Sequence, residues 1–194
     1  MKVKITFNQN NMRTQILILT LIAMLTSGLN SNAQSKKALV VYYSWGGNTR
    51  EMANQIRSIT GADIIEIIPV DAYPSDYNAC VDQAKKEINS NFKPAIKTKI
   101  ENLKDYDVVY VGSPNWWSTI APPIATFLSE NDLSGKTIIP FCTHGGGGKA
   151  RCFSDTQKLC PKSTVLEGLA IRDGGVKNAK ADVEKWLKEI SILK

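Results

Sequence analysis

The sequence predicts a single α/β domain in which a parallel sheet is covered by helices on both faces. From Ala38 onward, apolar runs of strand length alternate with amphipathic, helix-like segments. This alternation is typical of parallel strand pairing. The strand-like runs are almost continuously apolar, as expected of strands that are buried on both faces. A chain of 194 residues is also long enough to bury a core without disulfides or metal ions.

Five strands and five helices are predicted in strict alternation. The strands are expected at residues 38–44, 62–70, 107–114, 136–143 and 164–171. The helices are expected at residues 49–61, 80–89, 122–128, 150–159 and 176–190. Local signals support these ranges: Gly61 suits the end of the first helix, and Pro122-Pro123 suits the start of the third. The last helix carries its apolar residues at the spacing of one helical face.

The first 33 residues have the three-part pattern of a secretory signal peptide. Lys2, Lys4 and Arg13 precede an apolar run from Ile16 to Leu25, and small residues follow at 31–33. The apolar run is about half of the ~20 residues that span a bilayer, so a permanent membrane anchor is the weaker interpretation. We therefore expect a signal peptide at 1–33, a mature domain at 34–194, and an exported, periplasmic protein.

Composition excludes two classes of function. Residues 34–194 hold 21 basic and 18 acidic side chains, and no run of Lys or Arg exceeds two residues. Nucleic acid is therefore not an expected partner. One histidine and four scattered cysteines give no zinc-binding spacing, so no metal site is expected.

Export would place the four cysteines where disulfides persist. Cys80, Cys142, Cys152 and Cys160 allow three complete pairings, and buried free thiols are the other interpretation. A continuous helix between Cys152 and Cys160 would hold them about 12 Å apart, which is too far for a disulfide.

In open parallel sheets, ligands bind beyond the carboxyl ends of the strands, so the loops after strands 1, 3 and 4 are the candidate site. The first loop, Ser44 to Thr49, has two glycines and small polar residues directly before a helix. Glycine permits close approach of an anion, and helix N-terminal N–H groups favour negative charge. This pattern predicts a site for a monophosphate, without the lysine of a P-loop. Asp71, at the end of strand 2, keeps a dinucleotide site as the alternative.

The other two loops suggest what the phosphate is attached to. Ser113 to Ser118 contains adjacent tryptophans, of which one is expected to pack below and one to remain exposed for stacking on a flat heterocycle. Residues 143–148 contain four consecutive glycines, whose backbone amides are unobstructed and suited to bond the edge of a planar, polar ring. Together the three loops predict a site for flavin mononucleotide (FMN).

The mature chain resembles a flavodoxin, particularly the short-chain, exported flavodoxin-like proteins. The resemblance rests on S-x-x-G-N-T at 44–49 and P-x-W-W at 114–117, and it covers nearly everything from Ala38 onward. It implies a doubly wound, five-stranded parallel sheet in the order 2-1-3-4-5, of which flavodoxin itself is the standard example, with FMN where strands 1 and 3 diverge.

The resemblance also assigns the residues that hold the cofactor. The phosphate would be bound by Ser44, Gly46, Gly47, Asn48 and Thr49. The isoalloxazine and ribityl groups would contact Pro114, Asn115, Trp116 and Trp117. The flavin edge would be met by Thr143, His144, Gly145 and Gly146.

The chain departs from the family pattern in two respects. Gly46 stands where the better-known loop [ST]-x-T-G-x-T has a threonine, which removes one hydroxyl. Familiar flavodoxins are strongly acidic, whereas residues 34–194 are slightly basic. The basic redox partners of those relatives are therefore not carried over, because encounter complexes depend on complementary charge.

Three functions are consistent with these residues. The first is an electron carrier that holds FMN non-covalently and exchanges electrons with partner proteins or small acceptors. The alternative is an FMN-dependent NAD(P)H:quinone or small-acceptor reductase, with a pocket formed by the Tyr73–Tyr77 stretch and the tryptophan pair. There, His144 would be a proton donor. The third is a binding module without a cofactor, against which the intact phosphate-binding residues argue.

Overall fold

Strands β1 (Ala38–Tyr42) and β3 (Val108–Trp116) form the centre of a sheet of seven strands. The computed structural model describes residues 36–192, and the predicted signal peptide lies outside them. The other strands are β2 (Asp63–Glu66), β4 (Thr119–Ile120), β5 (Thr137–His144), β6 (Thr164–Val165) and β7 (Leu169–Arg172). The parallel order is β2-β1-β3-β5, with β6 and β7 both pairing with β5. The predicted fold class and strand order are confirmed.

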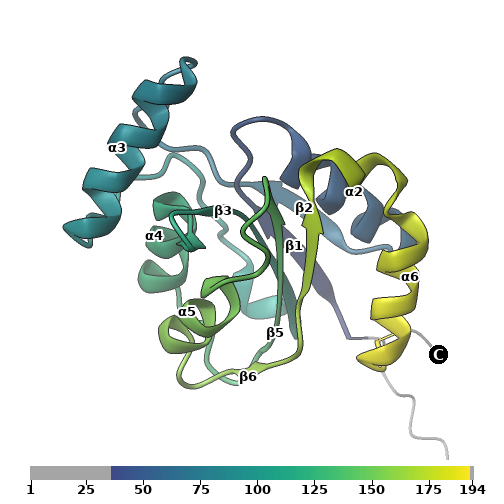
Figure 1. Ribbon diagram of the computed structural model, residues 1–194. Helices are drawn as coiled ribbons and strands as arrows, with labels where there is room; N and C mark the ends of the chain where they lie inside the picture. The colour runs from purple at the N-terminus through teal and green to yellow at the C-terminus, as the bar shows by residue number, and fades with distance from the viewer. Residues whose placement is uncertain (1–35, 193–194) are drawn as a thin grey trace, which may run out of the picture. The chain divides into compact units, whose positions relative to one another are not determined.

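Helices cover both faces of this sheet, as Figure 1 shows: α3, α4 and α5 lie on one side, and α2 and α6 on the other. The α-helices are α2 (Asn48–Thr60), α3 (Tyr77–Asn89), α4 (Pro122–Glu130), α5 (Cys152–Leu159) and α6 (Lys180–Glu189). Two short 3-10 helices, η1 (Leu103–Asp105) and η2 (Asp173–Asn178), complete the elements. None of the helices between residues 36 and 192 has the length and apolar character required to cross a bilayer.

The alternation of side chains along the central strands divides the core into two layers. Leu39, Val41 and Val109 belong to the layer beneath α4 and α5. Val40 and Tyr110 belong to the layer beneath α2 and α6. Because successive residues of a strand point to opposite faces, continuous apolar runs are what a sheet covered on both sides requires.

Three predicted helices agree with the structure within two residues at either end, and two differ more. The second begins at Tyr77 rather than Cys80, because the carboxylate of Asp76 caps it by accepting a hydrogen bond from the N–H of Ala79 (2.9 Å). The segment predicted as the start of the last helix forms η2 instead, and α6 begins at Lys180.

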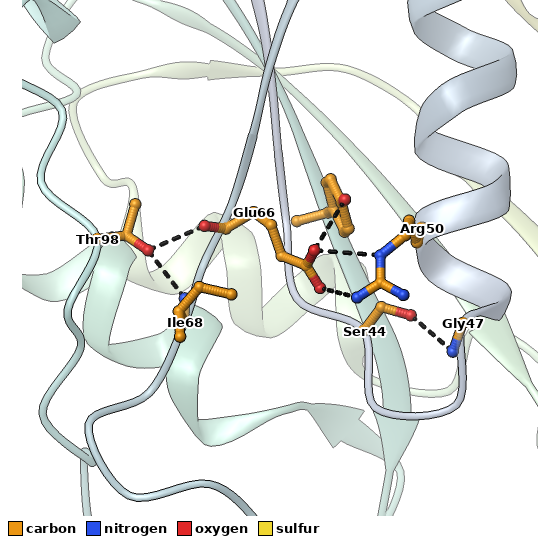
Figure 2. Close-up of polar contacts among 7 residues, drawn as sticks. Ser44, Gly47, Arg50, Glu66, Ile68 and Thr98 are labelled. Atoms are coloured by element: carbon orange, nitrogen blue, oxygen red, sulfur yellow. Dashed lines mark hydrogen bonds and ion pairs between the residues drawn. The ribbon is translucent and has the colours of Figure 1, made fainter.

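The predicted second strand, 62–70, is wrong beyond Glu66. Ile67 still donates to the carbonyl of Tyr42 (2.7 Å), but Ile68 and Val70 are exposed. The hydroxyl of Thr98 binds the carbonyl of Glu66 and the N–H of Ile68, as Figure 2 shows, and so draws the chain away from β1. The segment then pairs with residues 95–97. Pro69 lacks an N–H, and the two hydrogen bonds of this pairing are donated by Val70 and Lys97.

The predicted fifth strand, 164–171, is two strands separated by residues 166–168. Pro140 of β5 explains the interruption. Leu166 donates to the carbonyl of Ile138 (2.9 Å), and the next bond of a parallel ladder would come from the N–H of residue 140, which proline lacks. Gly168 passes so close that an added Cβ would lie 2.4 Å from the carbonyl oxygen of Pro140.

The four cysteines are free and buried, so none of the three possible disulfide pairings is present. Burial raises the pKa of the Cys160 thiol from 9.0 to about 11. Burial, with the charge of Glu87 as the smaller cause, raises the pKa of Cys80 from 9.0 to about 11. Both thiols therefore remain protonated at neutral pH.

We predict that the native protein reacts slowly with a thiol reagent at pH 8 and that four thiols react after unfolding without reductant. The raised pKa values favour folding below pH 9, and this contribution is lost as the pH rises from 9 to about 11. The free energy of unfolding should therefore fall across that interval, and less steeply in a Cys80→Ala, Cys160→Ala variant. Fewer than four thiols in the unfolded, unreduced chain would contradict the free-cysteine arrangement.

Candidate functional site

Three strands end side by side at one edge of the sheet, and their loops form the candidate site. Tyr42 of β1 pairs with Gly112 of β3, and Gly112 pairs with Phe141 of β5. Because these pairings are parallel and in register, the loops that follow emerge at the same edge. Gly112 is required at this point, since an added Cβ would lie 2.2 Å from the ring of Phe141.

The first loop presents backbone N–H groups at the start of α2. Gly47 precedes the helix with φ of 91° and gives it no side-chain cap. Within residues 36–192, the N–H groups of Asn48, Thr49 and Arg50 donate to no protein acceptor. The hydroxyl of Ser44 accepts from the N–H of Gly47 (3.1 Å), which holds the loop closed (Figure 2). Such unpartnered donors at a helix N-terminus form a site for an anion.

Arg50, the basic residue in the first turn of α2, is already paired with a carboxylate. Arg50 donates two hydrogen bonds to the carboxylate of Glu66 on β2 (2.7 and 3.1 Å), as Figure 2 shows. Tyr42 donates to the same carboxylate (3.1 Å). The hydrogen bond to Glu66 is the main cause that raises the pKa of Arg50. An anion at this loop would therefore be held by neutral N–H groups and not by a free arginine.

The loops enclose a cavity of about 210 Å3, which we call the polar chamber. It is lined by Ser44, Trp45, Gly46, Asn48, Thr49, Tyr77, Pro114, Asn115, Trp116, Thr143, His144, Gly145 and Asp173. The hydroxyls of Thr49 and Thr143 lie 2.9 Å apart and join the first loop to the third. Since one hydroxyl of such a pair donates to the other, one proton remains available for a further acceptor.

The third loop is held in place and is not a flexible linker. Asn115 donates from Nδ2 to the carbonyl of Gly148 (2.7 Å), where φ is 62°. The space around Gly146 is open, and a Cβ added at Gly145 would lie 3.9 Å from the carboxylate of Asp173. Within the part of the chain that the structure describes, Nδ1 of His144 is buried without a hydrogen-bond partner. A buried polar atom without a hydrogen-bond partner is costly, and His144 lines the polar chamber, so this nitrogen is a candidate contact for a polar ligand.

Asp173 enters the polar chamber from outside the three loops. It begins η2, and η2 is fastened to α2 because Gln55 donates to the carbonyl of Val176 (2.8 Å). Among the described residues that line this chamber, Asp173 is the one carboxylate, and there is neither a lysine nor an arginine.

A hairpin that was not predicted shapes the second loop. β3 continues to Trp116 and turns back through Trp117 and Ser118 into β4, with Asn115 paired to Ile120 and Trp116 to Thr119. Trp117 and Ser118 have φ of 50° and 69°, the left-handed backbone that two-residue hairpin turns require. Glycine and asparagine usually fill such positions, so a tryptophan here stores strain.

The turn separates the two tryptophans. Trp116 packs edge-on against Tyr43 and Tyr73, with ring centroids 5.6 and 4.9 Å away. Trp117 is 45% exposed, and its Nε1 donates to the carbonyl of Val81 on α3 (3.0 Å). Beneath Trp116, Tyr73 donates to the carboxylate of Glu87, and burial together with this carboxylate raises the pKa of Tyr73.

A second cavity, of about 310 Å3, adjoins the polar chamber, and we call it the aromatic chamber. It combines the two tryptophan-containing loops with one side of α3. Its lining residues are Trp45, Tyr77, Cys80, Val81, Ala84, Asn115, Trp116 and Trp117.

Most of the residues expected to hold a cofactor line the polar chamber. Three do not: Gly47 holds the helix start, Trp117 lines the aromatic chamber, and Gly146 lines neither. Trp45 and Asp173 were not expected at the site, and Tyr77 was expected only in the alternative pocket. No group of three or more metal-ligating side chains occurs within residues 36–192.

A doubly wound α/β sheet whose strand ends enclose an anion-binding loop and aromatic walls defines the class of nucleotide-binding, flavodoxin-like proteins. Comparison with known families agrees. The family model of flavodoxin matches residues 37–190, and the chain belongs to this family.

Three relatives illustrate the similarity. A flavoprotein from Bacteroides eggerthii is 32% identical, with a TM-score of 0.72 over 82% of this chain and 99% of that one. A flavoprotein from Lactobacillus acidophilus, solved in complex with FMN, is 29% identical, with a TM-score of 0.63 over 74% and 97%. A protein from Cupriavidus metallidurans named NAD(P)H dehydrogenase (quinone) is 28% identical over 149 residues, which are 69% of this chain and 70% of that protein.

We predict that Ser118→Val destabilises the protein by about 1–2 kcal/mol, because a β-branched side chain is unfavourable at positive φ. Ser118→Gly, which tolerates this backbone, is the matched control and should leave stability unchanged or slightly increased. Chemical denaturation measures both changes. Equal stabilities of the two variants would mean that the turn is not in the left-handed region.

Proposed function

We propose that the protein binds FMN non-covalently in the polar chamber and carries electrons between redox partners. One observation carries the proposal: three separate strand ends bring the free N–H groups of α2, the hydroxyl pair of Thr49 and Thr143, and the unpartnered Nδ1 of His144 to one cavity. Membership of the flavodoxin family and the FMN complex of the Lactobacillus relative support it.

The lining residues fit the chemistry of this cofactor. Free N–H groups at 48–50 and the hydroxyl of Thr49 suit a phosphate, and the open backbone at Gly46 leaves room for its approach. Asn115 and Asp173 offer polar atoms for ribityl hydroxyls. His144 and the amides after it suit the polar edge of a planar ring. When bound, FMN supplies the one- and two-electron chemistry, while these side chains bind and orient it.

The experiment that tests this function is a titration of flavin-free protein with FMN and with riboflavin, followed by flavin fluorescence. We expect one FMN per chain and weaker binding of riboflavin, because riboflavin lacks the phosphate that the α2 N–H groups would bind. Equal affinity for FMN and riboflavin would refute the proposed phosphate site. Failure to bind FMN would refute the proposed function.

We predict that Thr49→Val weakens FMN binding by about ten- to a hundredfold, because hydrogen bonds to charged groups contribute about 1.5–3 kcal/mol. Thr143→Val removes the partner hydroxyl 2.9 Å away, so it should also weaken binding, but less. Thr49→Ser keeps the hydroxyl and is the matched control. Circular dichroism confirms that each variant folds, and unchanged affinity in Thr49→Val would exclude Thr49 from the phosphate site.

A second candidate function is an FMN-dependent NAD(P)H:quinone reductase. Two observations favour it: the relatives named NAD(P)H dehydrogenase (quinone), and the aromatic chamber beside the polar one. Steady oxidation of NAD(P)H in the presence of a quinone would favour this function. Reduction of the protein by an electron-transfer partner, without such turnover, would favour the carrier.

Export is a separate part of the proposal, supported by the pattern of residues 1–33 alone. We predict that a bacterial host with a signal peptidase processes the chain near Ala33, so that the mature protein begins near Gln34. Mass spectrometry of the periplasmic fraction measures this end, and an Ala33→Leu variant should accumulate unprocessed. A full-length chain in the cytoplasm would contradict export.

A further inference from the structure

The positive charge of residues 34–194 is concentrated in one segment, residues 83–100. This segment holds five of the 21 basic and one of the 18 acidic side chains, so the remainder holds 16 basic and 17 acidic ones. The one acid, Glu87, is buried and accepts hydrogen bonds from Tyr73 and Gln83. The lysines are all exposed, and none forms an ion pair within residues 36–192. They are Lys85, Lys86, Lys93, Lys97 and Lys99.

Three of these lysines lie along one extended stretch that follows α3. Exposed and inward-facing residues alternate from Lys93 to Ile100, as in a strand, and the lysines at 93, 97 and 99 are all on the outer side. The inner side is fastened at two points. The hydroxyl of Thr126 on α4 donates to the carbonyl of Pro94 (2.8 Å), and the hydroxyl of Thr98 donates to the backbone of β2 (2.9 Å). The three lysines therefore extend from a held backbone, and we call them the lysine ridge.

A groove of about 290 Å3 lies beside the start of the lysine ridge, and we call it the α3–α5 groove. Figure 1 shows α3, α4 and α5 on the same side of the sheet. Phe92, directly before the ridge, is 54% exposed. Arg151 and Lys158 also line the groove, and both pair with Asp155, so the lining carries one positive charge in excess. Its apolar lining residues are Ile88, Phe92, Ile120, Pro122, Ala125 and Leu159.

The α3–α5 groove and the candidate site share the hairpin formed by β3 and β4. Trp117 of this hairpin lines the aromatic chamber, whereas Thr119 lines the groove. The ammonium group of Lys85 lies 4.7 Å from the centroid of the Trp117 ring. The N–H of Arg151 donates to the carbonyl of Ser118 (2.9 Å). A protein seated in the groove would therefore contact the hairpin that borders the candidate site.

We propose that the α3–α5 groove and the lysine ridge form the docking surface for an acidic electron-transfer protein. Such a partner would place an apolar side chain in the groove and its carboxylates beside the lysines. Complementary charge accelerates and orients the encounter, and an aromatic or aliphatic anchor stabilises the complex. An anionic membrane would also attract the lysines, but a concave, apolar groove favours a protein, whose side chains can enter it. The inference rests on the proposed carrier function and adds to it the charge of the partner and the face that binds it.

The test uses a reduced, acidic iron–sulfur ferredoxin as the probe and follows by stopped-flow absorbance the transfer of one electron from its cluster to the FMN-loaded protein. The variant Lys93→Gln, Lys97→Gln, Lys99→Gln should lower the second-order rate constant about tenfold at low salt. The rate constant of the parent should fall when NaCl is raised from about 20 to about 200 mM, because salt screens exposed charges. FMN affinity should be unchanged in the variant, since none of the three lysines lines the polar chamber.

The matched control is Lys180→Gln, Lys185→Gln, Lys188→Gln. These lysines are exposed on α6, on the opposite side of the sheet, and their loss lowers the net charge by the same amount. The rate constant should change by less than about twofold, because the two sets differ only in where the charge is removed. Equal rate constants for the ridge variant and this control would overturn the proposal. So would a rate constant of the parent that is unaffected or raised by salt.

Two further measurements separate the alternatives. Phosphatidylglycerol vesicles test the membrane. Sedimentation of the parent but not of the ridge variant with these vesicles, together with equal ferredoxin rate constants, would overturn the proposal and assign the lysines to a lipid surface. Calorimetry of ferredoxin with the flavin-free chain reports docking without the cofactor. Failure to bind FMN would refute the proposed function, whereas equal ferredoxin affinity of the flavin-free parent and ridge variant would refute the docking surface.

A second variant tests the groove independently of charge. Phe92→Ser removes the exposed ring beside the ridge, and the core is spared because more than half of this side chain is exposed. Ferredoxin affinity at low salt should fall about fivefold, the loss typical of an aromatic contact at an interface. The dependence on salt should remain as in the parent, since no charge is changed. Unchanged affinity in a folded Phe92→Ser protein would overturn the assignment of the groove.

Discussion

The parallel register of β1, β3 and β5 is the constraint on which the site depends. Gly112 lies in the central strand between Tyr42 and Phe141, and only glycine leaves room there for the Phe141 ring. A shift of one residue in either pairing would turn every side chain of the displaced strand to the opposite face. It would also separate Thr49 from Thr143, the hydroxyl pair that joins two of the loops. The position of the candidate anion site is thus fixed by packing in the core of the sheet.

Much of the fold could be predicted because the strands are buried on both faces and therefore appear in the sequence as continuous apolar runs. The deviations come from single residues whose effects are local. Pro140 was visible in the sequence, and its missing N–H divides the fifth strand into β6 and β7. The hairpin at Trp117 and Ser118 carried no signal of this kind, because its left-handed turn contains neither glycine nor asparagine.

The candidate site was predictable to the extent that its residues follow strands directly. Trp45 lies within the first loop, yet its role as a shared wall depends on a hydrogen bond to Pro74, 29 residues away. Tyr77 and Asp173 reach the polar chamber from the start of α3 and from η2. No spacing in the sequence relates these elements to the strand ends. Their placement follows from tertiary contacts, such as the bond from Gln55 to Val176 that fastens η2 to α2.

The charge of the site follows from the same contacts. The three loops contain no carboxylate, so by themselves they would do little to oppose an added electron on a bound flavin. Asp173 changes this balance, because a negative charge nearby disfavours a further one. Glu66 has little such effect, since Arg50 pairs with it through two hydrogen bonds. Apart from the imidazole of His144, Asp173 is the only acidic or basic side chain among the described residues that line the polar chamber. It is contributed by η2, which lies far along the chain from the loop that precedes α2.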